Sequence, residues 1–242
     1  MATDVNLRGS QIQSALLTAD LKVTGRLIDA SNATLLAKVE DEIGEISCIY
    51  KPIAGERPLW DFATGTLAHR EYAAYLLSSL GGFDVVPFTT LRHGPFGEGM
   101  VQHWIEVDES IDMMEFFQRD IPELRKIALF DAVVNNTDRK IGHLLPDSEG
   151  RVFGCDHGVT FHIEDKLRTV LWQWAGLQLH PVEISHLSSL QALLQGSLAQ
   201  ILEPLLTPDE LKALDMRVDR LISNATFPVP SSDWPSVPWP PF

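Results

Sequence analysis

The stretch "LFDAVVNNTDRKIGHLL", residues 129–145, decides the fold of this chain together with "VFGCDHGVTFH", residues 152–162. The first stretch runs from apolar residues into a polar cluster and then into two leucines, and the second begins with apolar residues again. The turn sequence "PDSEG" separates them, which predicts a short β-hairpin. Such a hairpin brings His143 of the first stretch close to Asp156 of the second.

These two stretches contain the residue types that a metal and phosphate site requires. Asp138 in "NNTDRK" can accept a hydrogen bond from a hydroxyl group and orient it. Arg139 and Lys140 add local positive charge to an acidic chain. Asp156 stands at a strand end before His-Gly and offers the hard oxygen ligand that Mg²⁺ prefers. Each half alone is equally typical of a capped polar turn, but their convergence with His143 favours a site.

Composition limits the classes of partner. The chain of 242 residues has 33 acidic and 19 basic residues and a net charge of −14, which disfavours nucleic acid and stable association with anionic membranes. Two cysteines suggest no disulfide framework and fit a reducing cytoplasm. No apolar run is long enough to span a bilayer. The N-terminal residues lack a basic start followed by an apolar stretch, so no signal peptide is expected.

The first half of the sequence predicts a small antiparallel sheet with one helix. Three strands are expected over residues 21–53, a helix in "LAHREYAAYLLSSLGG", and two more strands in "DVVPFTTLRHG" and "GMVQHWIEV". We therefore predict an N-lobe over residues 1–107, with a hinge near residues 100–107.

The second half predicts mainly helices. Helical periodicity occurs in two pieces over residues 110–136, in an apolar helix over residues 181–205, and in a helix opened by "TPDE" at residues 207–210. We expect a C-lobe over residues 108–225, with the catalytic segment at 129–162. A proline-rich tail at 226–242 is either an extended strap or disordered. This is an α+β, two-lobed layout with a cleft as the natural binding site.

Two further features of the first half suggest contacts to phosphate groups. Lys51 ends the third strand and can reach phosphates from the sheet, while Glu71 on the following helix can pair with it. Each residue alone is typical of a surface charge. Their order, a strand lysine followed by a helix glutamate, favours a functional role for both. Ser31 and Asn32 lie in a turn whose backbone N–H groups can bind phosphate, although an ordinary hairpin turn explains that pattern equally well.

The quoted catalytic segments resemble those of the phosphatidylinositol 3-/4-kinase-like superfamily. They are most similar to type II phosphatidylinositol 4-kinases and HipA-like kinases, which carry an Asn-x-Asp-Arg core. The stretches "ASNATLL", "YKPIAGERPLWDF", "GMVQHW" and "KLRTVLWQWAG" also resemble an actinobacterial family of kinase-like proteins. The resemblance covers residues 17–205 and implies a protein-kinase-like fold.

The resemblance also implies roles for single residues. Lys51 matches the ATP-binding lysine and Glu71 its helix partner, and Asp138 matches the catalytic aspartate. His143 stands where these kinases place a metal-binding asparagine, and Asp156 matches their metal-binding aspartate. The strand over residues 100–107 matches the hinge that binds adenine through its backbone, which assigns nucleotide contacts to Gln102, His103, Trp104 and Ile105.

The expected function is therefore phosphoryl transfer from ATP, with Mg²⁺ or Mn²⁺, to an unknown hydroxyl acceptor that is a small molecule or a protein serine or threonine. Imidazole suits transition metals better than Mg²⁺. His143 is therefore also consistent with an enzyme that prefers Mn²⁺, or with a pseudokinase that binds nucleotide without catalysis. Transfer of AMP to a protein is a third possibility. A globular protein without this site is the fourth, and it requires five separate elements to fall in kinase order by chance.

Overall fold

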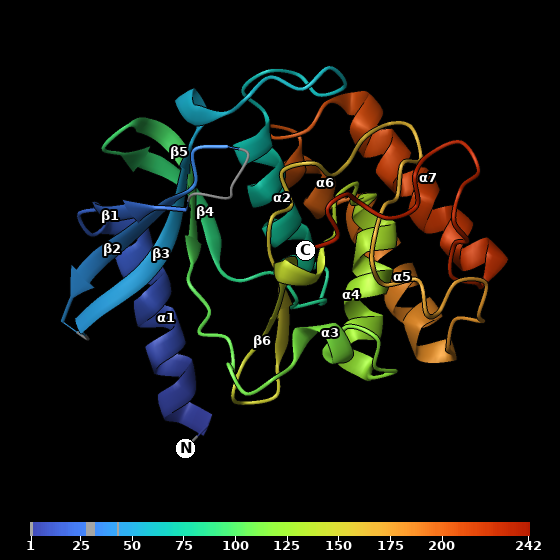
Figure 1. Cartoon of the computed structure of the whole chain (residues 1–242). Helices are drawn as coiled ribbons and strands as arrows, with labels where there is room; N and C mark the ends of the chain where they lie inside the picture. The colour runs from blue at the N-terminus through green and yellow to red at the C-terminus, as the bar shows by residue number, and fades with distance from the viewer. Residues whose placement is uncertain (1, 28–31, 43) are drawn as a thin grey trace. The chain divides into compact units, whose positions relative to one another are not determined.

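The computed structural model describes residues 2–27, 32–42 and 44–242. The chain forms two compact units, each taken separately below. Unit 1 comprises Met1–Tyr72 and Pro87–Ile105, and unit 2 comprises Ala73–Val86 and Glu106–Phe242. The helix α2, Leu67–Leu80, runs from the first unit into the second and confirms the helix predicted there (Figure 1).

Unit 1 is built on a five-stranded antiparallel sheet with the order β1-β2-β3-β5-β4. The strands are β1 Lys22–Arg26, β2 Leu35–Asp41, β3 Gly44–Pro52, β4 Thr89–Gly94 and β5 Gly97–His103. The predicted three-strand meander is confirmed, since β2 pairs with both β1 and β3. A 3₁₀ turn, η1 Ile53–Gly55, follows the meander.

The fifth strand differs from its prediction. It was expected to run to Val107 but ends at His103. The His103 amide still donates to the carbonyl of Phe88, yet the residue before Phe88 is Pro87. Because proline has no N–H group, it cannot extend the ladder on the β4 side. On the β3 side the Trp104 amide still donates to the Ser47 carbonyl, and residues 105–107 lie beyond the sheet.

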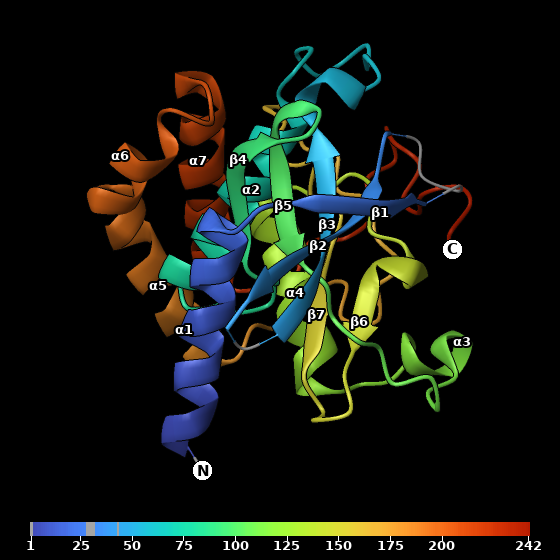
Figure 2. The same ribbon diagram turned by 90° about the vertical axis from the view of Figure 1, so that its left-hand side faces the viewer.

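A helix that the sequence analysis did not assign covers one face of the sheet (Figure 2). This helix is α1, Ala2–Thr18. Ala15 and Leu16 are buried, and Ile12 and Ala19 pack beside them against the apolar core of unit 1. These four positions follow the i, i+3, i+4, i+7 spacing of a helix face, so the signal was present in the sequence.

Unit 2 is mainly helical. Its elements after α2 are α3 Met113–Phe116, α4 Pro122–Val134, η2 Ile141–His143, β6 Leu144–Pro146, β7 Val152–Gly154, α5 Pro181–Leu194, α6 Ser197–Leu202 and α7 Pro208–Asn224. α7 packs against both α4 and α5 (Figure 1). The predicted hairpin is confirmed as β6 and β7, and Thr207 and Glu210 form the expected capping box of α7.

The helix predicted over residues 181–205 is two helices. α5 ends at Leu194 and α6 begins at Ser197. Gly196 between them has φ −143° and ψ −120°, which lies outside the helical region. Glycine carries a large entropic cost within a helix, so it is a natural place for the chain to break.

The α+β fold class is confirmed. The tail at 226–242 forms neither helix nor strand, and it lies along unit 2 as an extended strap. The amides of Ile141 and Thr169 donate to the carbonyls of Pro241 and Ser236 in the strap, at 2.8 Å and 3.1 Å. Within the described part of the chain, no helix combines the length and apolar character needed to cross a membrane.

Candidate active site

A buried ion pair lies within residues 129–162, the segment that the sequence predicted to be catalytic. Asp131 of α4 and Arg139 are both fully buried, and Arg139 Nη2 and Nε donate to Asp131 Oδ1 and Oδ2 at 2.8 Å and 2.9 Å. Burial by itself would lower the pKa of Arg139, but the charge and hydrogen bonds of Asp131 outweigh it and raise that pKa. The guanidinium expected to add positive charge to the site is therefore held inside the unit.

The Arg139 guanidinium joins the two halves of the site. Its Nη1 donates to the carbonyl oxygen of Cys155 at 2.8 Å, and its Nη2 lies 2.7 Å from Nε2 of the buried His157. Gly154 permits this approach, because a Cβ atom there would stand 3.0 Å from Nη2. The residues on either side of Asp156 thus contact the side chain that follows Asp138 in the chain.

Asn136 fixes the loop that carries Asp138. Its Nδ2 donates to Asp131 Oδ1 at 2.9 Å, and its Oδ1 accepts from the Asp138 amide at 3.0 Å. Asn135 ends α4 in a left-handed conformation, with φ 54°. Its side chain bonds the backbone of residues 162, 164 and 166. The turn-forming asparagines of the sequence are therefore the supports of the loop.

Asp138 is a partly exposed carboxylate with a perturbed pKa. Burial raises the pKa of Asp138 above its ordinary value of 3.8, and the charge of Asp156 raises it further. Lys140 opposes this shift, with its Nζ 3.5 Å from Asp138 Oδ2. The electrostatic coupling places the two aspartates that the sequence selected in one neighbourhood.

His143 and Asp156 are brought together as the hairpin predicted. His143 Nε2 lies 3.5 Å from Asp156 Oδ2, and nearly half of the Asp156 side chain is exposed. His143 Nδ1 faces the Lys140 amide at 3.4 Å, which assigns the proton of a neutral ring to Nε2. In the other tautomer Nε2 carries no proton, and its lone pair can then bind a metal ion.

The donor set fits a divalent cation that also contacts phosphates. No group of three or more His, Cys, Asp or Glu side chains placed to hold a metal occurs among the described residues. Mg²⁺ in nucleotide sites is commonly held by one or two carboxylates, with water and substrate phosphates completing its shell. An exposed carboxylate at Asp156 with an imidazole beside it meets this requirement.

Unit 1 carries the other predicted ion pair. Lys51 Nζ of β3 lies 2.6 Å from Glu71 Oε1 of α2, and only 2% of the Glu71 side chain is exposed. Glu56 accepts hydrogen bonds from the amides of Leu67 and Ala68 and so caps the start of α2. The lysine and its partner are thus held on rigid elements, in the order that the sequence indicated.

The remaining predicted residues of unit 1 have structural contacts. Asn32 Oδ1 accepts from the Arg57 amide at 2.9 Å, and Ser31 lies outside the described residues. Gln102 is buried within the sheet, where its side chain donates to Thr89. The amides of His103 and Trp104 donate to Phe88 and Ser47, respectively. Ile105 follows the end of the strand.

The sequence analysis did not select Asp131, Asn136 or His157, which surround Arg139. A signal was available for Asp131, because an acid in the apolar run "ALFDAVV" of a helix needs a partner when it is buried. His157 and Asn136 gave no such signal, since their roles depend on contacts formed only after folding.

Comparison with known proteins identifies solved structures with a similar fold and one relative in sequence. No protein-family profile matches the chain. Two crystal structures of Golgi casein kinase, one with Mn and ADP bound, match it with TM-scores of 0.55. Each covers 91% of this chain and 76% of the kinase chain, at 13% and 14% identity. The fold is therefore of the atypical protein-kinase type, as the sequence predicted.

The relative is a mycobacterial protein. Protein Rv2133c of Mycobacterium tuberculosis is 38% identical over 264 aligned positions, which cover 95% of each chain. This identity extends over both units rather than over one motif. The chain belongs to the same family as protein Rv2133c.

Proposed function

We propose that this protein is a kinase that transfers the γ-phosphoryl group of ATP to a hydroxyl acceptor, either a small molecule or a protein serine or threonine. The observation that carries the proposal is the neighbourhood of Asp138, His143 and Asp156, fixed from beneath by the buried Asp131–Arg139 pair. Phosphoryl transfer needs positioned charge and metal more than covalent catalysis, and this arrangement provides such positions.

Asp138 is the residue that orients the acceptor. Its carboxylate accepts the hydroxyl proton as the acceptor oxygen bonds to the γ-phosphorus, and the bond to the bridging oxygen breaks to release ADP. A carboxylate whose pKa is raised by burial is a better proton acceptor than an exposed one, and perturbed groups of this kind cluster at active sites. Lys140, beside Asp138, supplies positive charge near the transferred group.

Asp156 is the metal-binding residue of the proposal, with His143 as the second ligand. A divalent ion held there would neutralise charge on the phosphates during transfer. Because imidazole suits transition metals, His143 should make the site bind Mn²⁺ in preference to Mg²⁺. Arg139 acts as a positioning residue for both aspartates, because it directly follows Asp138 in the chain and bonds the Cys155 carbonyl that precedes Asp156.

In unit 1, Lys51 is assigned to the α- and β-phosphates, with Glu71 holding its ammonium group in place. Residues 102–105 are assigned to the adenine, with Trp104 and Ile105 at the point where the chain leaves the sheet. Asn32 is assigned to the phosphates through its turn, while its side-chain oxygen accepts a hydrogen bond from the Arg57 amide.

Three lines of support come from outside the site. Golgi casein kinase, which shares the fold, has been crystallised with Mn and ADP. The catalytic segments resemble those of the phosphatidylinositol 3-/4-kinase-like superfamily. The net charge of −14 argues against an anionic lipid surface as the acceptor and favours a cytoplasmic alcohol or protein.

A nucleotide-binding pseudokinase is the second candidate, and one observation favours it. His143 stands beside Asp156 in place of the asparagine usual in related kinases, and a protonated imidazole at 3.5 Å would form an ion pair with the proposed metal ligand. Such a pair weakens metal binding. Both candidates predict nucleotide binding, and only the first predicts turnover.

The test combines calorimetry of ATP binding, with Mg²⁺ and with Mn²⁺, and transfer assays with ATP labelled at the γ- or α-phosphate. Asp156→Ala should lose metal-dependent ATP binding. Asp138→Asn should retain binding and lose transfer of the γ-label. Binding without any transfer would support the pseudokinase, and transfer of the α-label would identify AMP transfer. Equal ATP affinity in wild type and Asp156→Ala would refute the metal assignment.

A further inference from the structure

Unit 2 contains a pocket that is separate from the residues assigned above. It has a volume of about 310 Å³, which is within the range of small-molecule sites. Its walls come from the end of α4, the segment 165–172, the second half of α7 and the strap at 228–231. None of Asp138, His143 and Asp156 lines it.

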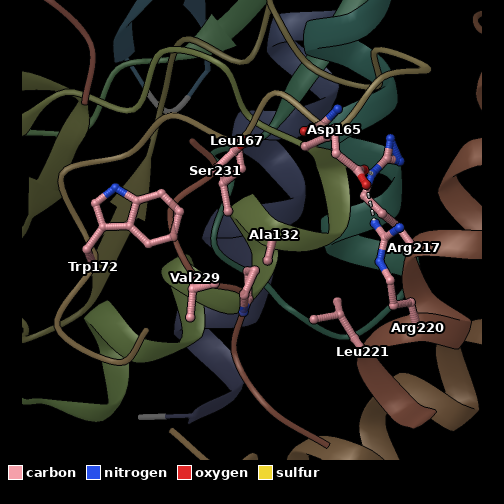
Figure 3. Close-up of a pocket in the computed structure, with 11 residues that line it drawn as sticks. Ala132, Asp165, Leu167, Trp172, Arg217, Arg220, Leu221, Val229 and Ser231 are labelled. Atoms are coloured by element: carbon pink, nitrogen blue, oxygen red, sulfur yellow. Dashed lines mark ion pairs between the residues drawn. The ribbon is translucent and has the colours of Figure 1, made fainter. Parts of the chain in front are cut away.

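The two ends of the pocket differ in chemistry (Figure 3). Asp165, Arg217 and Arg220 gather at one side, and the Trp172 indole lies at the opposite side. The wall between them is mainly apolar and includes Leu167 and Val229. A pocket of this kind suits a ligand with one charged end and an apolar body.

The charged end has an excess of positive charge. Arg220 Nη2 bonds Asp165 Oδ2 at 2.6 Å, and Arg217 Nε lies 3.7 Å from Asp165 Oδ1, too far for a hydrogen bond. One carboxylate therefore faces two guanidinium groups. Burial lowers the pKa of Arg217 to about 10, with Asp165 opposing and Arg220 adding to the shift. Arg217 is thus still charged at neutral pH.

Arg217 also has hydrogen-bonding capacity to spare. It is 4% exposed, and its Nη2 donates to the carbonyl of His162 at 2.9 Å. Its Nε and Nη1 donate to no partner among the residues that the structure describes. Buried donors without acceptors are costly and rare in native proteins. A second acceptor with negative charge would satisfy these donors and balance the second arginine.

We propose that this pocket binds a small organic anion, a carboxylate on an aromatic or aliphatic body, with the carboxylate at Arg217 and Arg220 and the apolar body against Trp172. The volume admits a compact acid rather than a polymer. Any effect of the ligand on phosphoryl transfer rests on the proposed function, whereas binding itself does not.

The pocket is connected to the catalytic segment by backbone hydrogen bonds. The Arg168 amide donates to the Asn136 carbonyl at 2.9 Å, and the amides of Arg139 and Val170 form bonds of 3.1 Å with the carbonyls of Arg168 and Arg139. The segment that presents Leu167 and Trp172 to the pocket is therefore paired with the loop carrying Asp138.

The test is calorimetry without nucleotide, using 1-naphthoate as the probe and the neutral 1-naphthalenemethanol as its matched control. Wild type should bind the acid on the order of tenfold or more tightly than the alcohol, because a charge-assisted pair is lost. Arg220→Gln, at a half-exposed position, should weaken acid binding by a similar factor. Val229→Trp, at the exposed rim, should fill the pocket and abolish binding.

The control variant is Lys212→Gln, which removes one positive charge from the exposed face of the same helix α7 and should bind like wild type. Hydrogen exchange locates the site, since 1-naphthoate should protect residues 165–172 and 217–229. The proposal is overturned by absence of binding, by equal affinity for acid and alcohol, or by protection confined to other segments. Undiminished affinity in both Arg220→Gln and Val229→Trp would identify adventitious binding and overturn it as well.

Discussion

Replacing Asp131 with asparagine should destabilise unit 2 far more than the loss of one ordinary hydrogen bond. The change keeps the shape of the side chain but leaves the fully buried Arg139 guanidinium without its counter-ion. It also turns one acceptor of the bidentate pair into a donor. Removing one partner of a buried ion pair typically costs about 3–5 kcal/mol, because the remaining charge stays in a low-dielectric site.

Urea unfolding followed by tryptophan fluorescence measures this cost, and Trp174 of unit 2 is a buried reporter. With a slope of about 3 kcal/mol/M for a chain of this size, the midpoint should fall by about 1–2 M. The matched control is Glu40→Gln, the same acid-to-amide change in the exposed Lys22–Glu40 pair. That variant should stay within about 0.5 kcal/mol of wild type.

A further variant separates the charge from the packing. Asp131→Leu combined with Arg139→Met removes both charges and should be more stable than Asp131→Asn, because no lone charge is buried. A midpoint shift for Asp131→Asn below about 0.3 M would amount to an ordinary hydrogen bond. That result would refute the argument that Arg139 depends on Asp131 for its charge balance.

Three other changes test the assigned residues. Lys51→Ala should abolish turnover and cost about 3 kcal/mol, since it removes the cation that faces the buried Glu71 carboxylate. Adding Glu71→Gln should restore stability in urea but not turnover. Asp138→Asn should make the protein more stable than wild type at pH 7. Because the folded-state pKa of Asp138 is raised, its contribution to the free energy of unfolding is fully present below about pH 4 and is lost as the pH rises. The difference in stability between Asp138→Asn and wild type should therefore vanish in urea titrations at low pH. His143→Asn should shift the metal preference of ATP binding from Mn²⁺ towards Mg²⁺, and an unchanged profile in calorimetry would remove His143 from the metal ligands.

Much of the fold followed from local signals in the sequence. The meander, α2 and the β6–β7 hairpin were predictable because alternation, helical spacing and turn residues act over short distances. The errors had different causes. Gly196 divided the predicted helix into α5 and α6, and β5 ended before Val107 where Pro87 offers no N–H group on the β4 side, whereas α1 was missed although its apolar spacing was present.

The partly exposed residues of the site were predictable from the sequence. Asp138 and Asp156 stand in recognisable contexts, and the hairpin predicted that His143 would approach Asp156. The support beneath them was predictable only in part. A buried acid at Asp131 implies a partner, but the identity of that partner as Arg139, and the contact of Arg139 with residue 155, depend on how α4 packs against β7. The spacing of residues along the chain does not predict how these two elements pack.

A buried ion pair is weak evidence for stability, since apolar residues of similar volume often serve as well. The Asp131–Arg139 pair is therefore better explained by what it positions. Asp138 and Asp156 repel each other, and the pKa of Asp138 is raised in part for this reason. Two like charges stay adjacent only when the surrounding structure holds them there. Arg139 does so by following Asp138 directly in the chain while donating to the carbonyl that precedes Asp156. The repulsion that remains is the kind of local cost that a bound divalent cation relieves.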